Sequence, residues 1–503
     1  MSLDRIDPAF RVLPLTALAD AALTRARELG AQHADVRVER ISTQTISLRD
    51  GSVTGVSDDT AVGLAVRVIV DGVWGFASHV ELSPQRAAAT AERAVAVART
   101  LAPVAIERVE RADEPVHADA VWVSAYTLDP FTVPTRDKVG LLTEWSQRLL
   151  AADGVDHVQA GVMQVRECKF YADLTGTSTT QQRVRVAPSF TATAVDRASG
   201  GFETMSSLAP PAGRGWEYLT GDGWDWDGEL VVVPELLAEK VKSPSVQAGA
   251  YDLVIDPTNL WLTIHESVGH ATEYDRAIGY EAAYAGTSFA TPDKLGTLRY
   301  GSGLMHVTGD RTIEHGLATV GFDDDGVETS QWDLVRDGVL VGYQLDRTFA
   351  PRLGLERSNG CAYADSPHHV PIQRMANVSL QPDPVRDTTT DELIAGVDRG
   401  IYVVGDKSWS IDMQRYNFQF TGQRFFRIAD GRLAGQLRDV AYQATTTDFW
   451  GSMDAVGGSS TWVLHGAMNC GKAQPGQVAA VSHGTPSARF RGVNVLNTQE
   501  EGR

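Results

Sequence analysis

The stretch His265-Glu266-Ser267-Val268-Gly269-His270 places two imidazoles in one short segment, with a carboxylate beside the first. In a regular helix, histidines at positions i and i+5 point about 140° apart, whereas those at i and i+4 point about 40° apart. Two ligands of one metal therefore need a local distortion at this spacing. A π-bulge near Gly269 would supply it, because a π-bulge inserts an i to i+5 turn and glycine tolerates unusual backbone angles. The spacing predicts a locally irregular helix.

These residue types suit a hydrolytic zinc site. Zinc binds neutral imidazole nitrogens, and a catalytic zinc keeps an open position in which water is activated. A nearby carboxylate that does not bind the metal can accept the proton of that water, and Glu266 is placed for this role. His265 and His270 are therefore candidate metal ligands, with Glu266 the candidate general base. The alternative is a surface helix with two unrelated histidines.

The third ligand has two candidates. The cysteines of the chain are Cys168, Cys361 and Cys470. So few cysteines, without a CxxC pair, argue against a disulfide scaffold and suit a reducing cytoplasm. Cys470 precedes Gly471 and Lys472 in a glycine-flanked turn that would let the backbone pass close to a metal, and Lys472 is placed to lower the pKa of the thiol. Glu273 is the rival, although a carboxylate at this spacing more often hydrogen-bonds a ligand or faces solvent.

Seven segments in both halves of the chain carry a resemblance to a known family: residues 34–40, 46–51, 72–78, 265–270, 342–347, 397–402 and 470–472. Together they resemble the TldD/PmbA metallopeptidases. The histidine motif indicates the TldD-like branch, because the PmbA-like branch lacks it. The resemblance implies zinc bound by His265, His270 and Cys470, with Glu266 as the catalytic base.

Two segments depart from the pattern of that family. The turn after Cys470 is longer than the family's Gly-Lys-x-Gly-Gln and continues to Gln477. Residues 407–412, Lys-Ser-Trp-Ser-Ile-Asp, replace a segment that tends to be glycine-rich in relatives. Both changes bear on access to the site and on substrate preference.

The resemblance implies hydrolysis of short or unfolded peptides in an enclosed site. It also implies a dimer with a PmbA-like paralogue that lacks the motif, or otherwise with a second copy of the chain. Two alternatives stay open: a non-enzymatic scaffold or binding protein with a structural zinc, and a hydrolase of non-protein amides. A structural zinc is closed by four protein ligands, so the count of three good ligands favours catalysis.

Length and charge limit the remaining possibilities. A chain of 503 residues exceeds what one core usually organises, so two domains are expected, over residues 1–228 and 229–503. With 45 basic and 64 acidic residues the net charge is −19, which disfavours nucleic acid and anionic membranes as partners. Without a long apolar run or an apolar start, the sequence predicts a cytoplasmic protein.

The order of elements predicts an α+β fold. In the first half, helices over 16–29, 84–101 and 137–152 lie on antiparallel hairpins that turn at Asp50-Gly51 and Asp71-Gly72. Ser83 and Pro84 are expected to cap the second helix. A Gly, Pro and Trp-rich stretch over 199–227 then marks the boundary. The second half is predicted to be a β-rich sandwich or barrel-like domain carrying the metal-binding helix.

Other candidates have structural interpretations. Asp323-Asp324-Asp325-Gly326 resembles the start of a calcium loop but lacks the matching glutamate, so a solvated hairpin tip is predicted. His368-His369 and His465 are expected at the surface or in packing roles. Trp409 and Trp450 would line a peptide groove or, by default, pack in the core.

Overall fold

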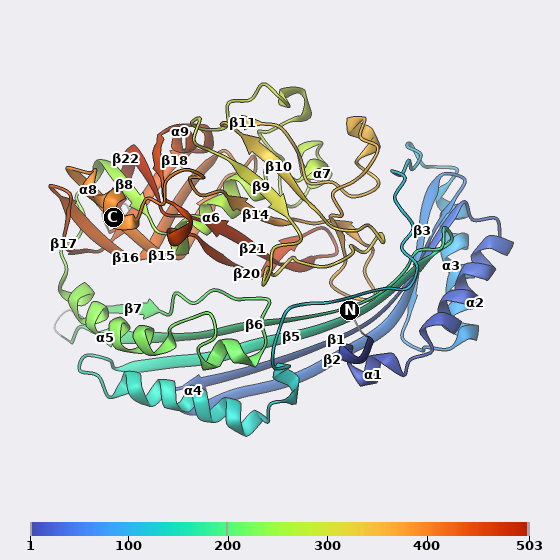
Figure 1. Cartoon of the computed structure of the whole chain (residues 1–503), viewed down its shortest axis with the longest axis horizontal. Coiled ribbons are helices and arrows are strands. Elements are labelled where there is room, and N and C mark those ends of the chain that lie inside the picture. The colour runs from blue at the N-terminus through green and yellow to red at the C-terminus, as the bar shows by residue number, and fades with distance from the viewer. Residues whose placement is uncertain (1–2, 198–199, 500–503) are drawn as a thin grey trace.

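Long antiparallel strands form a curved sheet in the first half of the chain, whose computed structural model describes residues 3–197 and 200–499 (Figure 1). Its main strands are β1 (His33–Arg49), β2 (Ser52–Val70), β5 (His157–Asp173) and β6 (Ser178–Val195). Shorter strands, β3 (Val73–His79), β4 (Ala120–Val123) and β7 (Phe202–Ser206), complete the order β3-β2-β1-β5-β6-β4, with β7 also paired to β6. The predicted turns at Asp50-Gly51 and Asp71-Gly72 are confirmed, because both have positive φ angles and join paired strands.

Helices cover one face of this sheet. They are α1 (Pro8–Arg11), α2 (Leu15–Glu28) and α3 (Pro84–Leu101) at one end, and α4 (Thr135–Leu150) and α5 (Trp226–Lys242) at the other. Val36 and Ile46 of β1 contribute to the two helix-facing cores from the same side of the strand, because alternate residues share a face. Ser83 accepts a hydrogen bond from the Arg86 amide, with Pro84 at the first helical position, as predicted.

Helix α5 crosses the expected boundary between residues 228 and 229. Its side chains Leu230, Val233 and Leu237 belong to the core shared with the N-terminal sheet. The division into 1–228 and 229–503 stays a prediction.

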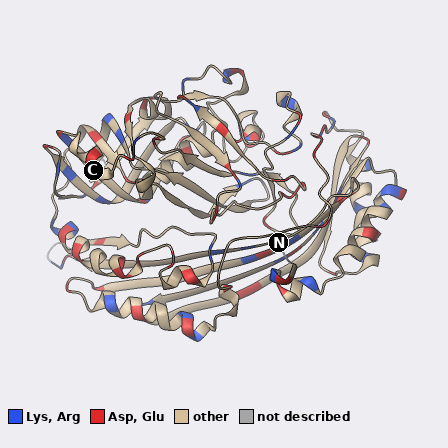
Figure 2. Ribbon diagram, in the orientation of Figure 1, with Lys and Arg blue, Asp and Glu red and all other residues tan. Residues whose placement is uncertain are grey.

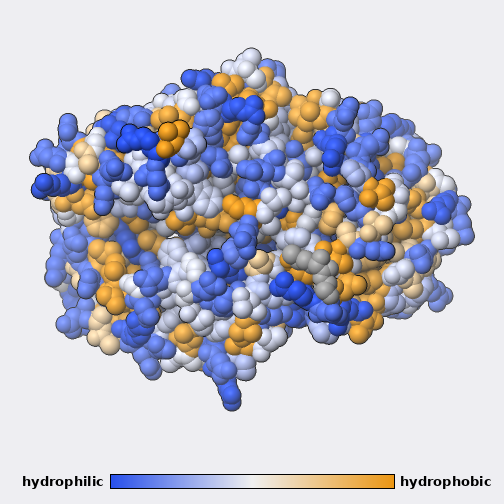
Figure 3. All heavy atoms as spheres, viewed as in Figure 1, coloured by the Kyte–Doolittle hydropathy of each residue, from blue (hydrophilic) through white to orange (hydrophobic). Residues whose placement is uncertain are grey.

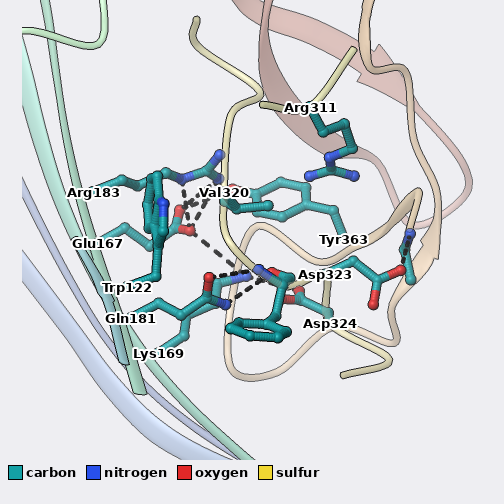
Figure 4. Close-up of a pocket in the computed structure, with 12 residues that line it drawn as sticks. Trp122, Glu167, Lys169, Gln181, Arg183, Arg311, Val320, Asp323, Asp324 and Tyr363 are labelled. Carbon is teal, nitrogen blue, oxygen red and sulfur yellow. Dashed lines mark hydrogen bonds and ion pairs between the residues drawn. The ribbon is translucent and has the colours of Figure 1, made fainter. Parts of the chain in front are cut away.

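The opposite face of the sheet carries buried charged residues that pack against the second half of the chain; Figure 2 shows charged positions within these strands. Lys169 donates a hydrogen bond to Asp324 at 2.7 Å, and Arg67 pairs with Asp325. The predicted solvated hairpin tip is therefore wrong: Asp323, Asp324 and Asp325 are buried, and the first two line a small cavity (Figure 4). Burial, then the neighbouring Asp325, raises the pKa of Asp323 to about 8.

A closed five-stranded barrel forms the centre of the second half. Its strands are β8 (Gly249–Ile255), β15 (Arg399–Ile411), β16 (Asn417–Ala429), β18 (Val440–Thr445) and β22 (Ala488–Asn497). The ring closes because β15 pairs with both β8 and β16. Two strands extend it: β17 (Arg432–Leu437) and β19 (Met453–Val456).

Smaller sheets lie beside the barrel. The strands are β9 (Val307–Asp310), β10 (Gln331–Arg336), β11 (Val339–Leu340) and β14 (Asn377–Leu380) in one sheet, and the pairs β12 (Ala362–Tyr363) with β13 (Ile372–Gln373) and β20 (Val463–Lys472) with β21 (Gln477–Thr485). The helices are α6 (Pro257–Ile264), α7 (Tyr274–Ala277), α8 (Thr390–Ala395) and α9 (Thr446–Gly451). The predicted α+β fold, with a barrel-containing domain that carries the motif helix, is confirmed.

The outer surface is mixed. Figure 3 shows hydrophobic residues on one face in small groups among hydrophilic ones. Within the described ranges, no helix is both long and apolar enough to span a bilayer.

Candidate metal centre

The histidine motif continues a buried helix. Asp256 caps α6 by accepting a hydrogen bond from the Thr258 amide at 3.0 Å, and Pro257 occupies the first helical position. The α-helix then changes to a π-helix over His265–Gly269, in which the amide of His270 donates to the carbonyl of His265 at 3.0 Å. The predicted distortion is confirmed, and it brings both imidazoles to one side.

Gly269 does not have a positive φ, and it packs closely against the side chain of Met375. A Cβ atom there would lie 2.6 Å from the sulfur of Met375, much closer than two such atoms can approach. The glycine thus lets the π-helix press against the residues that precede β14.

Three candidate ligands meet at one point. One ligand atom from each of His265, His270 and Cys470 lies within 4.8 Å of the other two, and all three residues are buried. Cys470 comes from β20, which packs against α6. Its Sγ lies 3.6 Å from Nε2 of His270. Tetrahedral zinc, with bonds of about 2.3 Å to sulfur and about 2.05 Å to nitrogen, separates two such ligands by roughly 3.6 Å, so the spacing fits zinc.

A third histidine fixes the tautomer of the first. His483 Nδ1 lies 2.8 Å from the carbonyl oxygen of Val378, which can only accept, so this nitrogen carries the proton. Burial, then His265, holds the pKa of His483 well below its usual value, so the ring is neutral and its Nε2 accepts. His265 Nδ1 therefore donates to that Nε2 at 2.7 Å. The lone pair of His265 Nε2 is left for a metal.

A carboxylate fixes the second imidazole in the same way. His270 Nδ1 donates to Glu273 at 2.9 Å, which leaves Nε2, the atom beside Cys470, as the free lone pair. Burial raises the pKa of Glu273, but Lys472, His270 and Arg276 outweigh it and hold the pKa well below its usual value. Glu273 thus lies on the Nδ1 side of His270, away from the Nε2 atom that faces Cys470.

Lys472 does not act on the thiol as predicted. Its ammonium donates to Glu273 at 3.1 Å and to Asp275 at 2.8 Å. Burial raises the pKa of the Cys470 thiol. His270 and, to a smaller extent, Arg374 lower this pKa by more than burial raises it, so the net shift favours the thiolate. The thiolate that a metal needs is favoured by an imidazole and an arginine.

Glu266 lies beside the three ligands but outside their group. Burial raises its pKa, whereas His270, His265 and then Arg415 lower it, so the pKa lies below its usual value. Arg415 donates to Glu266 at 2.6 Å, from the turn between β15 and β16. The carboxylate is therefore ionised at neutral pH, as a general base must be.

Trp450, His465 and Trp409 lie in different environments. Trp450 is fully buried, and its indole donates to Ser267 at 3.0 Å. His465 is buried and stacks on Trp261, which confirms its packing role. Trp409, by contrast, is 52% exposed and lies against Glu266, so it is not a core residue.

Known proteins are similar to this chain in sequence and in fold. Residues 248–497 match the PmbA/TldA metallopeptidase C-terminal domain, and residues 34–98 match PmbA/TldA metallopeptidase domain 1. A metalloprotease of Methanothermobacter thermautotrophicus is 28% identical over 93% of this chain and 96% of its own length. A zinc metalloprotease TldD homolog of Saccharolobus solfataricus is 24% identical over 54% of this chain and 58% of its own. The crystal structure of TldE from Thermococcus kodakarensis superposes with a TM-score of 0.69 at 15% identity, covering 94% of this chain and 98% of that one.

Proposed function

Because the chain belongs to the PmbA/TldD metallopeptidase family, we propose that it is a zinc-dependent peptidase acting on short or unfolded peptides. One observation carries the proposal: two imidazoles with fixed tautomers and a thiolate surround one point, with an unligated carboxylate beside them. Two imidazoles and a thiolate form a ligand set that suits zinc. The relative named a zinc metalloprotease supports the same metal.

The ligand count supports catalysis over a structural zinc. In the described part of the chain, the group contains His265, His270 and Cys470 and no fourth His, Cys, Asp or Glu. A structural zinc has four protein ligands, whereas a catalytic one keeps a position for water. The scaffold alternative therefore has less support than hydrolysis.

Each residue of the site has a separate role in hydrolysis. His265 and His270 present their Nε2 atoms, and Cys470 its sulfur, to the metal. Bound zinc would polarise the scissile carbonyl and lower the pKa of a water molecule. Glu266 accepts a proton from the attacking water and passes it to the leaving amine. His483 and Glu273 hold the two imidazoles in the required tautomers.

Removal of the metal should abolish hydrolysis reversibly. We expect a chelator to reduce the cleavage rate of an unfolded peptide library at least about 100-fold, and one equivalent of zinc to restore it, because zinc activates the water. Cleavage is measured by mass spectrometry, with a buffer-exchanged sample as the control. Zinc-loaded protein that cleaves no peptide, with a paralogous partner present, would favour the scaffold. Cleavage of small amides but not peptides would favour the amidase.

We also propose that the protein works as a dimer, with a PmbA-like paralogue or with itself. The structural likeness to TldE, together with relatives named TldD homologs, supports a paralogous pair. Two subunits would enclose the site and exclude folded proteins, and such interfaces bury well over about 1,000 Å².

Light scattering of the chain, alone and after co-expression with a motif-lacking paralogue, should give the mass of two subunits in at least one case. The protein should then cleave extended peptides and leave folded proteins intact. A peptidase that stays monomeric in both samples would contradict the enclosed dimer.

A further inference from the structure

The turn between β15 and β16 is built to present one arginine to Glu266. Arg415 has a φ of +63°, which is unfavourable for a residue with a side chain. The carboxylate of Asp412 holds this turn by accepting from the amides of Gln414 at 3.1 Å and Tyr416 at 2.8 Å. The fold therefore maintains a strained backbone that places a cation beside the proposed general base.

The guanidinium of Arg415 has unused hydrogen-bonding capacity. It donates to Glu266 at 2.6 Å and to the carbonyl of Ala285 at 3.2 Å, while its Nε is buried and has no partner among the described residues. Arg276 donates to the same carbonyl, and its Nη2 is likewise buried and unpartnered within the described chain. Two guanidiniums, paired with Glu266 and Glu273 respectively, thus converge on one carbonyl oxygen, and each keeps a nitrogen without a partner in the part of the chain that the structure describes. Leaving such donors unsatisfied is costly, and an anion would satisfy them.

Exposed apolar side chains surround this turn. Trp409, Met413 and Tyr284 are 52%, 55% and 56% exposed. The segments that bear them are joined directly, because the amide of Thr287 donates to the carbonyl of Met413 at 2.7 Å. Gly286 permits this contact, since its φ is +89° and a Cβ there would lie 2.1 Å from that carbonyl oxygen. These three side chains form an apolar rim beside the turn, and Trp409 also contacts Glu266.

We propose that Arg415 binds the free C-terminal carboxylate of a peptide, so that the enzyme removes C-terminal residues. This inference rests on the peptidase function proposed above. The planar fork of a guanidinium matches a carboxylate, and the apolar rim suits an apolar terminal side chain.

Geometry limits how many residues are removed. If the Arg415 guanidinium donates one hydrogen bond to Glu266 and another to the substrate carboxylate, the two carboxylates lie within roughly 7 Å of each other. Each residue of an extended chain spans about 3.5 Å, so the scissile bond is the first or second from the C-terminus. The reaction remains hydrolysis: water forms the new C–O bond, the C–N bond breaks, and Glu266 passes the proton to the leaving amine.

The test compares one peptide as its free acid and as its C-terminal amide. We expect zinc-loaded protein to prefer the acid by at least about 50-fold in kcat/KM, with products shortened from the C-terminus, because the amide cannot pair with the guanidinium. Arg415→Gly, which keeps the positive φ, should reduce this ratio to within about 3-fold of unity. Arg415→Lys should retain about 10-fold, since a point charge lacks the fork. Arg136→Ala is the matched control, because Arg136 is 87% exposed, and it should keep the parent ratio.

A second measurement separates this inference from the proposed function. By calorimetry, 3-phenylpropionate should bind the parent at least about 10-fold more tightly than 3-phenylpropanamide, and Arg415→Gly should remove the difference. If the parent keeps this preference but cleaves no peptide, the proposed peptidase function is wrong and the carboxylate site stands. Any of three outcomes would overturn the carboxylate site. They are equal binding of the two probes, equal cleavage of the acid and the amide by the parent, and an equal loss of kcat/KM on both peptides in Arg415→Gly.

Discussion

Replacing Cys470 with alanine should reduce the zinc content of the purified protein from about one ion per chain to less than about 0.1. Cys470 is one of three buried candidate ligands, and its Sγ lies at the separation from His270 Nε2 that tetrahedral zinc requires. His265→Ala and His270→Ala should have the same effect. Elemental analysis after dialysis against metal-free buffer measures it, and peptide hydrolysis should disappear with the metal.

Three further variants make the result specific. Cys361→Ala removes another buried cysteine and should keep the zinc. Glu273→Gln and His483→Gln alter partners of the ligands, and zinc affinity should fall by only about 10- to 100-fold. A Cys470→Ala protein that retained its full metal content would remove the thiol from the ligand set.

The parts of the site that sequence reasoning could predict are those encoded by local spacing. A separation of five residues between His265 and His270 requires an i to i+5 turn if both face one metal, and the structure contains that turn. Turns and caps are local in the same sense. Asp50-Gly51 adopts the positive φ angles that Asp-Gly favours in a tight turn, and Ser83 with Pro84 begins its helix through contacts between neighbouring residues.

The parts that could not be predicted depend on pairs of residues distant in sequence. His483 is 218 positions from His265, and Arg415 is 149 positions from Glu266. Neither lies in a motif, and pairing of that kind follows from how β21 and the β15–β16 turn pack around α6. The signal that was available for Arg415 was indirect: it follows closely after residues 407–412, which are predicted from the sequence to differ from the family pattern.

The error at Asp323-Asp324-Asp325 has the same origin. Three consecutive carboxylates before a glycine are typical of an exposed turn, because burying unpaired charges is costly. Here Arg67 and Lys169 supply the opposite charge from two strands of the N-terminal sheet. Strand alternation directs these cations to the face opposite the helices, where the second half of the chain covers them. A sequence shows the charges but not which of them meet.

The electrostatics of Glu266 give the second prediction with a large expected effect. Glu266→Gln should leave the fold and the zinc content unchanged and reduce kcat/KM for peptide hydrolysis at least about 100-fold. Glutamine has the size of glutamate, and its carbonyl oxygen can still accept the hydrogen bond that Arg415 donates, so the β15–β16 turn should stay in place. Its amide cannot accept a proton from water. The measurement is kcat/KM per bound zinc, with Glu314→Gln, an exchange at a side chain that is 72% exposed, as the matched control. Undiminished turnover in Glu266→Gln would require another base. In that case the ionised carboxylate would serve to pair with Arg415 rather than to move a proton.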